Sequence, residues 1–177
     1  KDLSGDPECW CDESFSGYDV SARVVKLVAN VSAIGSVETP SIFSAGAAIY
    51  AAIDLIESLG RRVELWLGSG SRHHNGSRLQ VFVKVKEAGQ PLEPDRIAFF
   101  LCHNATLRRL FFSVEAQLGF AANVSKTTPL EMDDGSIITP EVHRNDNTKE
   151  RRIKRVLEVC ESVGIEFSSE ELAGVTT

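Results

Sequence analysis

The fold is decided by residues 24–68, which read VVKLVANVSAIGSVETPSIFSAGAAIYAAIDLIESLGRRVELWLG. Apolar side chains fill most of the first ten positions, which predicts a strand that is covered on both faces. The Thr39-Pro40 pair is typical of a helix start, because threonine caps free backbone N–H groups and proline suits the first turn. Apolar residues then recur every three or four positions until Gly60, which predicts one long amphipathic helix.

A second strand is predicted at residues 62–68, where Val63, Leu65 and Leu67 alternate with other side chains. Two strands joined by a helical connection of this length form a parallel, right-handed βαβ unit. Residues 79–85 alternate in the same way. The polar, glycine-rich stretch between the second and third strands therefore predicts an antiparallel hairpin with a long exposed tip.

The second half of the chain has weaker patterns. Pro94 predicts the start of a helix that continues through residues 97–102, in preference to a buried strand there. Residues 109–116 predict a strand, with helical continuation to Gly119 as the alternative. A small hairpin is predicted around residues 133–135, where Asp-Asp-Gly suits a tight turn.

The last predicted elements are a helix and a strand. Ile153, Val156 and Cys160 recur at helical spacing before Gly164, and residues 165–167 predict a final strand. We therefore expect one α/β domain over residues 21–177, preceded by an arm over residues 1–20. Its mixed, mainly parallel sheet would be covered by helices on both faces and carry an antiparallel edge hairpin, in a Rossmann-like arrangement.

Composition and charge exclude several classes of function. The 177 residues suffice for one hydrophobic core, and 42% hydrophobic with 25% charged residues is typical of a folded globular domain. A net charge of −6 argues against a general nucleic-acid binder, because phosphates are neutralised by an excess of Lys and Arg. The apolar stretch near residues 42–59 contains Asp54 and Glu57, so we expect no membrane-spanning segment.

Two resemblances add to this interpretation. The order of elements is similar to that of von Willebrand factor A-like domains, in which a helix connects two parallel strands and a hairpin adds an antiparallel edge. Three phrases also resemble an uncharacterised family of bacteriophage and bacterial proteins: GDPECW at residues 5–10, AGAAIYAAIDLIESLGRRVELW at 45–66 and GQPLEPDRIAFFLCHNATLRRLFF at 89–112. That family has His-Pro where this chain has His103-Asn104. The resemblance implies a phage-encoded origin and no established activity.

The expected location is a host cytoplasm or a virion. The first residues lack the basic and apolar layout of a signal peptide, and Lys1 in place of Met indicates a processed or partial chain. Cys102 and Cys160 have apolar sequence neighbours, as buried thiols do, which favours a reducing compartment.

The resemblance to von Willebrand factor A-like domains also implies a place for a metal. In that fold an Asp-x-Ser-x-Ser pattern after the first strand supplies oxygen ligands to magnesium. Here the matching stretch is Asn30-Val31-Ser32-Ala33-Ile34, so an amide replaces the acid and isoleucine replaces the second serine. Ser36 and Thr39 would replace the missing oxygens in part, with Glu115 as the nearest acid. The first expectation remains a domain without a cofactor, and magnesium held by Asn30, Ser32, Ser36 and Thr39 is the alternative.

Other residues are candidates for contacts with partners. Cys9 and Cys11 could share a soft metal, but no second pair of ligands accompanies them in the sequence. His103 is interpreted as organising a turn rather than as a catalytic base. The interaction candidates lie in the arm, the hairpin tip, the helical region and the basic C-terminal helix: Trp10, His73, His74, Arg108, Arg109, Arg151, Arg152, Lys154 and Arg155.

No catalytic constellation is complete in the sequence. We therefore predict a non-enzymatic interaction or assembly module of a phage, which binds other protein subunits. One alternative is a metal-assisted binding domain or hydrolase that works in the crevice after the first strand, where open α/β sheets bind ligands. The other is a nucleic-acid-associated factor that uses the basic residues within 149–155.

Overall fold

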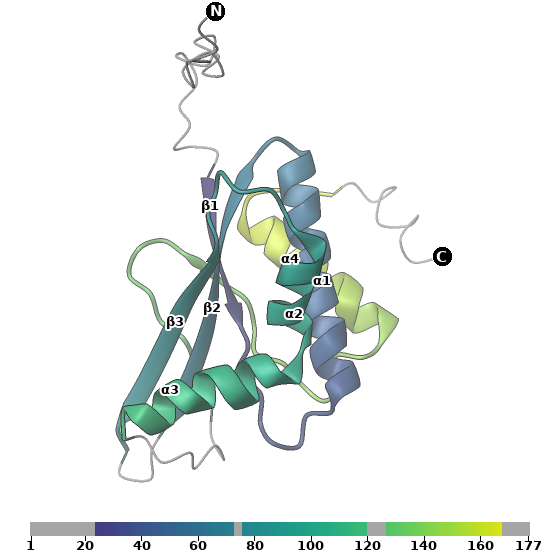
Figure 1. The fold of residues 1–177 in the computed structure, drawn as a ribbon. Helices are drawn as coiled ribbons and strands as arrows, with labels where there is room; N and C mark the ends of the chain where they lie inside the picture. The colour runs from purple at the N-terminus through teal and green to yellow at the C-terminus, as the bar shows by residue number, and fades with distance from the viewer. Residues whose placement is uncertain (1–23, 73–75, 120–126, 168–177) are drawn as a thin grey trace, which may run out of the picture.

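The chain was analysed as a computed structural model, which describes residues 24–72, 76–119 and 127–167. Within these residues the strands form one sheet of order β3-β2-β1-β4 (Figure 1). The strands are β1 (Val24–Asn30), β2 (Arg62–Arg72), β3 (Arg78–Lys86) and β4 (Ile137–Ile138). The helices are α1 (Thr39–Ser58), α2 (Pro94–Cys102), η4 (Thr106–Phe111), α3 (Phe112–Gln117) and α4 (Lys149–Ser162). The predicted arm, residues 1–20, lies outside the described residues.

The predicted βαβ unit and hairpin are confirmed. β1 and β2 are parallel neighbours, with Val25 opposite Val63 and Leu27 opposite Leu65. β3 pairs antiparallel with β2 at one edge of the sheet, and β4 pairs parallel with β1 at the other. The domain is therefore α/β with a mixed sheet that is mostly parallel.

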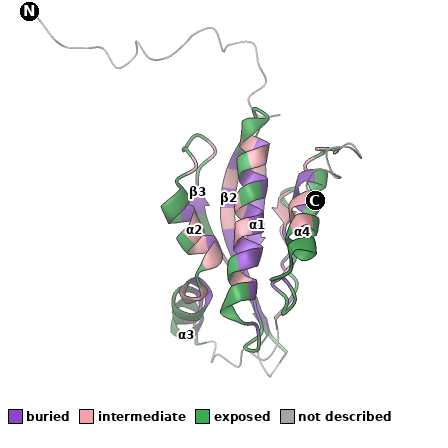
Figure 2. Cartoon of the chain, turned by 90° about the vertical axis from the view of Figure 1, so that its right-hand side faces the viewer, coloured by how far each residue is buried: buried purple, intermediate pink, exposed green. Residues whose placement is uncertain are grey.

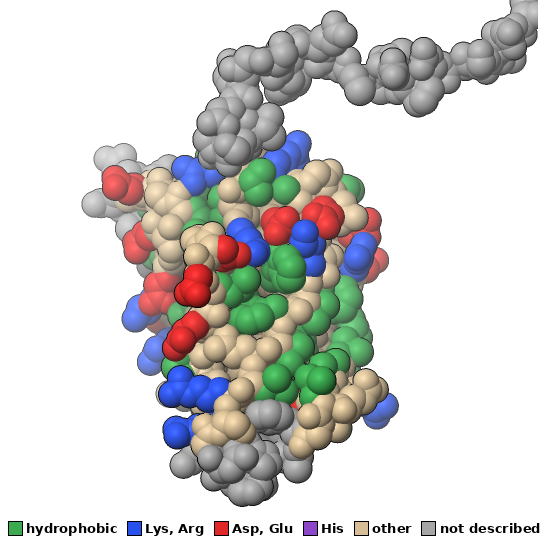
Figure 3. Space-filling model, turned by 90° about the vertical axis from the view of Figure 1, so that its left-hand side faces the viewer, with side chains coloured by type: hydrophobic (Ala, Val, Ile, Leu, Met, Phe, Trp, Pro, Cys, Tyr) green, Lys and Arg blue, Asp and Glu red, His purple; other side chains and the backbone are tan. Residues whose placement is uncertain are grey.

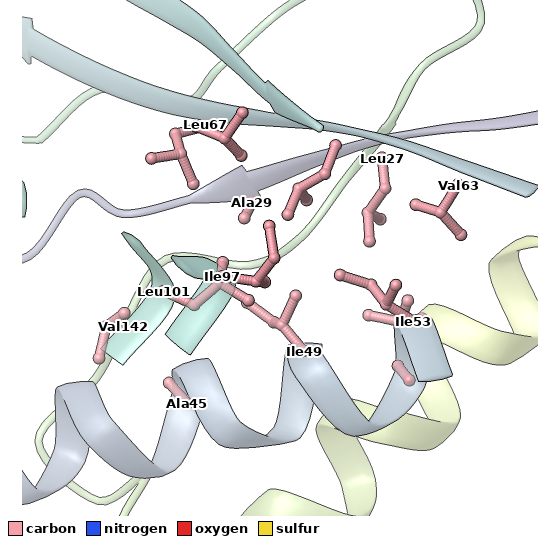
Figure 4. Close-up of a cluster of buried hydrophobic side chains, with 14 of the residues drawn as sticks. Leu27, Ala29, Ala45, Ile49, Ile53, Val63, Leu67, Ile97, Leu101 and Val142 are labelled. Carbon is pink, nitrogen blue, oxygen red and sulfur yellow. The ribbon is translucent and has the colours of Figure 1, made fainter. Parts of the chain in front are cut away.

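The hydrophobic core lies between α1 and the centre of the sheet (Figure 4). Ile49, Ile53 and Ile56 of α1 are at most 3% exposed, because they pack toward the apolar residues of β1 and β2. Gly46 brings α2 close, since a Cβ there would lie 2.3 Å from the carbonyl oxygen of Leu101. By length and composition alone α1 could span a membrane, and half of its most apolar stretch is buried inside the domain.

The helices α1, α2 and α4 lie together on one face of the sheet (Figure 2). The opposite face is contacted by the chain that leads to β4. The backbone N–H of Glu131 donates to the side-chain oxygen of Gln80 at 3.0 Å, and Lys26 pairs with Asp134. Helices on both faces were expected, whereas the described part of the chain covers this second face with an extended segment.

That second face combines charged and hydrophobic side chains (Figure 3). The ring of Trp66 lies between two ammonium groups, 4.7 Å from Lys26 Nζ and 5.1 Å from Lys84 Nζ. The indole N–H of Trp66 donates to Glu64 at 2.6 Å, and this bond holds the pKa of Glu64 below its ordinary value. Because cations stabilise the face of an indole ring, a large aromatic residue is accommodated on an otherwise polar surface.

The glycine-rich stretch after Leu67 continues β2 and does not begin an exposed tip. Gly68, Ser69, Gly70 and Ser71 are all buried. A Cβ at Gly68 would lie 2.6 Å from Leu130, and one at Gly70 would lie 2.6 Å from the carbonyl oxygen of Thr128. The glycines therefore allow another segment to cross the strand closely, a use of strand glycine that composition alone does not distinguish from a loop.

Helix α2 confirms the preferred interpretation of residues 97–102. The strand predicted at residues 109–116 is wrong, because η4 and α3 are helical there, as the alternative held. Leu107, Phe111 and Glu115 are buried at a spacing of four residues, which is a helical period that the run of apolar letters obscured.

Two further predictions near the C-terminus are wrong. Residues 133–135 do not form a hairpin; they form a bend before β4, which pairs parallel with β1. Residues 165–167 are not a strand. The backbone N–H groups of Gly164 and Ile165 instead donate to the carbonyls of Glu161 and Cys160, which closes α4 with a glycine at φ 74°.

We expect Gly70→Ala to lower the free energy of unfolding by about 1–3 kcal/mol, because the new methyl group would overlap the backbone of Thr128. Urea unfolding followed by circular dichroism measures this change. Gly89→Ala is the matched control, since no atom lies within 4 Å of its added Cβ. Equal stability of the two variants would show that the crossing of Thr128 over β2 is wrong.

Candidate functional site

The crevice beyond the carboxyl end of β1 contains the first two candidate metal residues. The backbone N–H of Asn30 donates to the hydroxyl of Thr139, and the side-chain oxygen of Asn30 accepts from the backbone N–H of Ser32, both at 3.0 Å. The hydroxyl of Ser32 accepts from the backbone N–H of Gly70 at 3.0 Å. These bonds join the ends of β1 and β2 to the residue after β4.

The other two candidate metal residues have separate partners. The hydroxyl of Ser36 accepts from Nε of Arg144 at 3.0 Å, and the hydroxyl of Thr39 accepts from the side chain of Asn104 at 3.4 Å. Within the described ranges, no three His, Cys, Asp or Glu side chains lie close enough to hold a metal ion. The polar groups of this crevice thus bond mainly to the protein itself.

His103 lies between α2 and η4, at a turn. Its Nδ1 accepts from the backbone N–H of Ala105 at 3.1 Å, and its ring stacks on Phe99 with 5.4 Å between centroids. Burial raises the pKa of the neighbouring thiol of Cys102 and that of Cys160, so neither is favoured as a thiolate nucleophile. These contacts fit the interpretation of His103 as a turn residue.

Glu115, which the sequence analysis gave only as the acid nearest to the candidate metal residues, is buried. It is 1% exposed on the inner side of α3, and one of its carboxylate oxygens has no hydrogen-bond partner among the described residues. The hydroxyl of Ser71, at the end of β2, is also buried; it lies close to Glu115, but the geometry between the two is not that of a hydrogen bond. Burial raises the pKa of Glu115, against a smaller opposing effect of Ser71.

The basic run of α4 does not form one surface. Arg155 is 5% exposed and points inward, while Lys154 pairs with Glu158 at 3.5 Å on the outside. Arg151 and Arg152 are exposed but border two different hollows. A helical period spreads these neighbouring cations around the helix, which reduces the charge presented to any single partner.

Arg155 is the centre of a buried polar cluster. Its guanidinium donates to the carbonyls of Pro140 and Glu141 at 2.9 and 3.0 Å and to the carboxylate of Asp146 at 2.6 Å. Asp146 also accepts from the backbone N–H of His143 at 2.7 Å. One arginine therefore bridges two separate parts of the connection between β4 and α4, and its place in the basic run gave no sign of this role.

A long apolar groove lies between α1 and α4, with a volume of about 610 Å³. Ala47, Ala48 and Ala51 of α1 form one wall, and Ile153, Val156 and Leu157 of α4 form the other. Lys149 and Arg152 border it. Small residues on one wall and apolar side chains on the other resemble the grooves that accept a helical or extended segment of another protein.

The remaining interaction candidates divide between the described and undescribed residues. Arg108 and Arg109 are exposed on η4. Trp10, His73 and His74 lie outside the described residues, as do Cys9 and Cys11.

We expect Asp146→Ala to lower the free energy of unfolding by about 3 kcal/mol or more, because it leaves the buried guanidinium of Arg155 without its carboxylate. Thermal and urea unfolding measure the loss. Lys154→Gln, on the same helix, removes only an exposed ion pair and should change stability by no more than about 0.5 kcal/mol. A loss as small in Asp146→Ala would contradict the role assigned to the cluster.

Glu115→Gln should stabilise the domain at pH 7.5, on the order of 1 kcal/mol. Since burial raises the pKa of Glu115, the folded protein keeps its proton over a pH range in which the unfolded chain ionises, so wild-type stability falls as pH rises above about 4. Glutamine removes this loss, and the two proteins should converge near pH 4. Glu131→Gln is the exposed control. A pH-independent difference between wild type and Glu115→Gln would contradict this explanation.

Comparison with known proteins gives a family and no function. No curated protein and no solved structure matches the chain. One family model, described as a domain of unknown function (DUF7192), matches residues 2–166. The chain therefore belongs to the DUF7192 family.

Proposed function

We propose that this domain is a non-enzymatic assembly module whose α1–α4 groove binds an acidic, aromatic-containing segment of a second copy of the chain. The observation that carries the proposal is the groove itself, about 610 Å³ of mainly apolar surface bordered by Lys149 and Arg152. A hydrophobic groove with a basic border suits a segment that combines apolar and acidic side chains.

The chain contains a segment of this chemistry. Residues 2–19 include six acidic residues and no Lys or Arg, and they include Trp10, Phe15 and Tyr18. Aromatic side chains are the usual anchors of protein interfaces. With roughly 3.3 Å per extended residue, the 23 residues before β1 could reach about 75 Å, far enough for a neighbouring subunit.

The alternatives have weaker support. A crevice metal site would need Asn30, Ser32, Ser36 and Thr39, but the three hydroxyl groups accept hydrogen bonds from Gly70, Arg144 and Asn104. A nucleic-acid surface on α4 would lose Arg155 to the interior. Each alternative would therefore have fewer side chains for ligand binding than its candidate residues in the sequence suggested.

The proposal extends to the finer fold and the origin of the protein. The sheet order β3-β2-β1-β4, with β3 antiparallel, supports a von Willebrand factor A-like arrangement. The phrases within residues 5–112 support a phage-encoded protein of the host cytoplasm or the virion.

Size-exclusion chromatography with light scattering should find the full chain as an oligomer. Ala51→Trp, which fills the groove, and Arg152→Glu, which reverses its border charge, should each weaken association by about tenfold or more. Lys154→Glu is the control, because it makes the same charge change on the same helix outside the groove.

Three results would contradict the proposal. One is a strict monomer that does not bind a labelled peptide of residues 1–20. Another is an oligomer that Ala51→Trp and Arg152→Glu leave unchanged. A monomer in which the groove still binds that peptide would place the segment in its own subunit and remove the assembly function.

A further inference from the structure

A second hollow, separate from the α1–α4 groove, is lined by residues that follow the carboxyl ends of β1 and β4. Its volume is about 500 Å³, which is within the range of pockets that hold small molecules. The loop after β1 contributes Ile34 and Val37, the segment after β4 contributes residues 141–145, and α4 contributes Arg151.

The hollow lies at the point of the sheet where β1 and β4 are neighbours. β2 lies on one side of β1 and β4 on the other, so the strand order reverses between β1 and β4. In open α/β sheets the crevice outside the strand ends at such a switch point is the usual place for a ligand. The hollow therefore lies where a sheet of this kind commonly binds a ligand.

The charge of the hollow is mainly positive, in a chain whose net charge is −6. Arg144 and Arg151 reach it from the loop and from α4, and neither pairs with a carboxylate among the described residues. His143 also lines the hollow. Among the described residues that line it, Glu141 is the one acid, and its carboxylate accepts from the hydroxyl of Thr127 at 2.6 Å.

Arg144 and the segment that carries it are held in place before any ligand binds. Nε of Arg144 donates to Ser36 at 3.0 Å, and the backbone carbonyl of Arg144 accepts from the hydroxyl of Ser41 at 2.7 Å. The buried ion pair of Arg155 and Asp146 fixes the same segment from below, at 2.6 Å. A site that is fixed in advance loses less entropy when a ligand binds.

We propose that this hollow binds the phosphate group of a small phosphate monoester, through Arg144 and Arg151. The planar guanidinium fork matches the oxygens of a phosphate, and no bond to a described residue occupies the two terminal nitrogens of Arg144 while its Nε bonds to Ser36. Ile34, which is 40% exposed, lines the same hollow and faces the organic part of the ligand, whereas Val37 is only 3% exposed.

The test is isothermal titration of the full chain with adenosine monophosphate, inorganic phosphate and adenosine as probes. We expect both phosphate-bearing probes to bind and adenosine not to bind. Arg144→Gln and Arg151→Gln should each weaken binding by about tenfold, the effect of losing one charge-assisted contact. Arg96→Gln, an exposed arginine of α2 away from the hollow, is the control and should bind as wild type does.

Arg151→Gln protects the test against a folding defect, because Arg144 also holds Ser36 whereas the Arg151 side chain has no such bond among the described residues. The proposal is overturned if neither phosphate probe binds, if adenosine binds as well as its monophosphate, or if Arg96→Gln weakens binding as much as the other two variants. These outcomes are independent of the oligomeric state, so they leave the proposed assembly function untouched.

Discussion

The burial of α1 is the constraint on which the rest of the domain depends. One side of α1 covers β1 and β2, while α2 and α4 pack on its flanks. Ala52, Ile53 and Ile56 are completely buried, so α1 contributes apolar surface to almost every contact of the core. Removing this helix would expose the sheet and separate the two flanking helices. The outer side of the same helix, rich in alanine, forms one wall of the groove that we assign to assembly.

The polar cluster around Arg155 stabilises the connection after β4, as the burial of α1 stabilises the core. The chain between β4 and α4 has no regular hydrogen-bond ladder, and the guanidinium of Arg155 replaces it by donating to two carbonyls and a carboxylate. A buried ion pair is costly to dehydrate, so its value here is conformational: it selects one path for the segment. Residues 141–145 of this segment line the hollow beyond β1, so its shape depends on the path that the segment takes. The structural role and the proposed binding role thus meet in one short stretch of chain.

Most of the fold could be predicted from the sequence, and the failures have identifiable causes. The elements within residues 24–102 have strong periodicity, flanking turns and near-sequential pairing, so β1, α1, β3 and α2 were expected close to where they occur, and β2 was expected except for residues 69–72. β4 has two residues and pairs with a strand far away in the sequence, so no local pattern identifies it. Gly68 and Gly70 resembled a loop because their need for space arises from Thr128 and Leu130, which only the folded chain brings near.

The candidate sites were less predictable than the fold. The residues after β1 were expected to lie at a crevice, and they do, but the bonds of Ser36 and Thr39 to Arg144 and Asn104 depend on tertiary contacts. The inward turn of Arg155 had no signal in the sequence, because the helical period distinguishes faces only when the orientation of the helix is known. The sequence pattern predicted the apolar side of α4, but the groove could not be predicted because it depends on where α1 lies relative to α4.

The pairing of β1 with β4 has a consequence for the order in which the chain folds. β1, α1, β2 and β3 are consecutive in sequence, and the three strands among them pair as neighbours, so the closure entropy of this unit is small. Leu27, by contrast, meets Ile137 only after the whole central part of the chain has been placed. Contacts of such high sequence separation form late and slow the folding of a domain. We therefore expect the strand-helix-strand unit with its hairpin to act as the template, and the C-terminal third, which contains both the hollow and one wall of the groove, to complete the domain last.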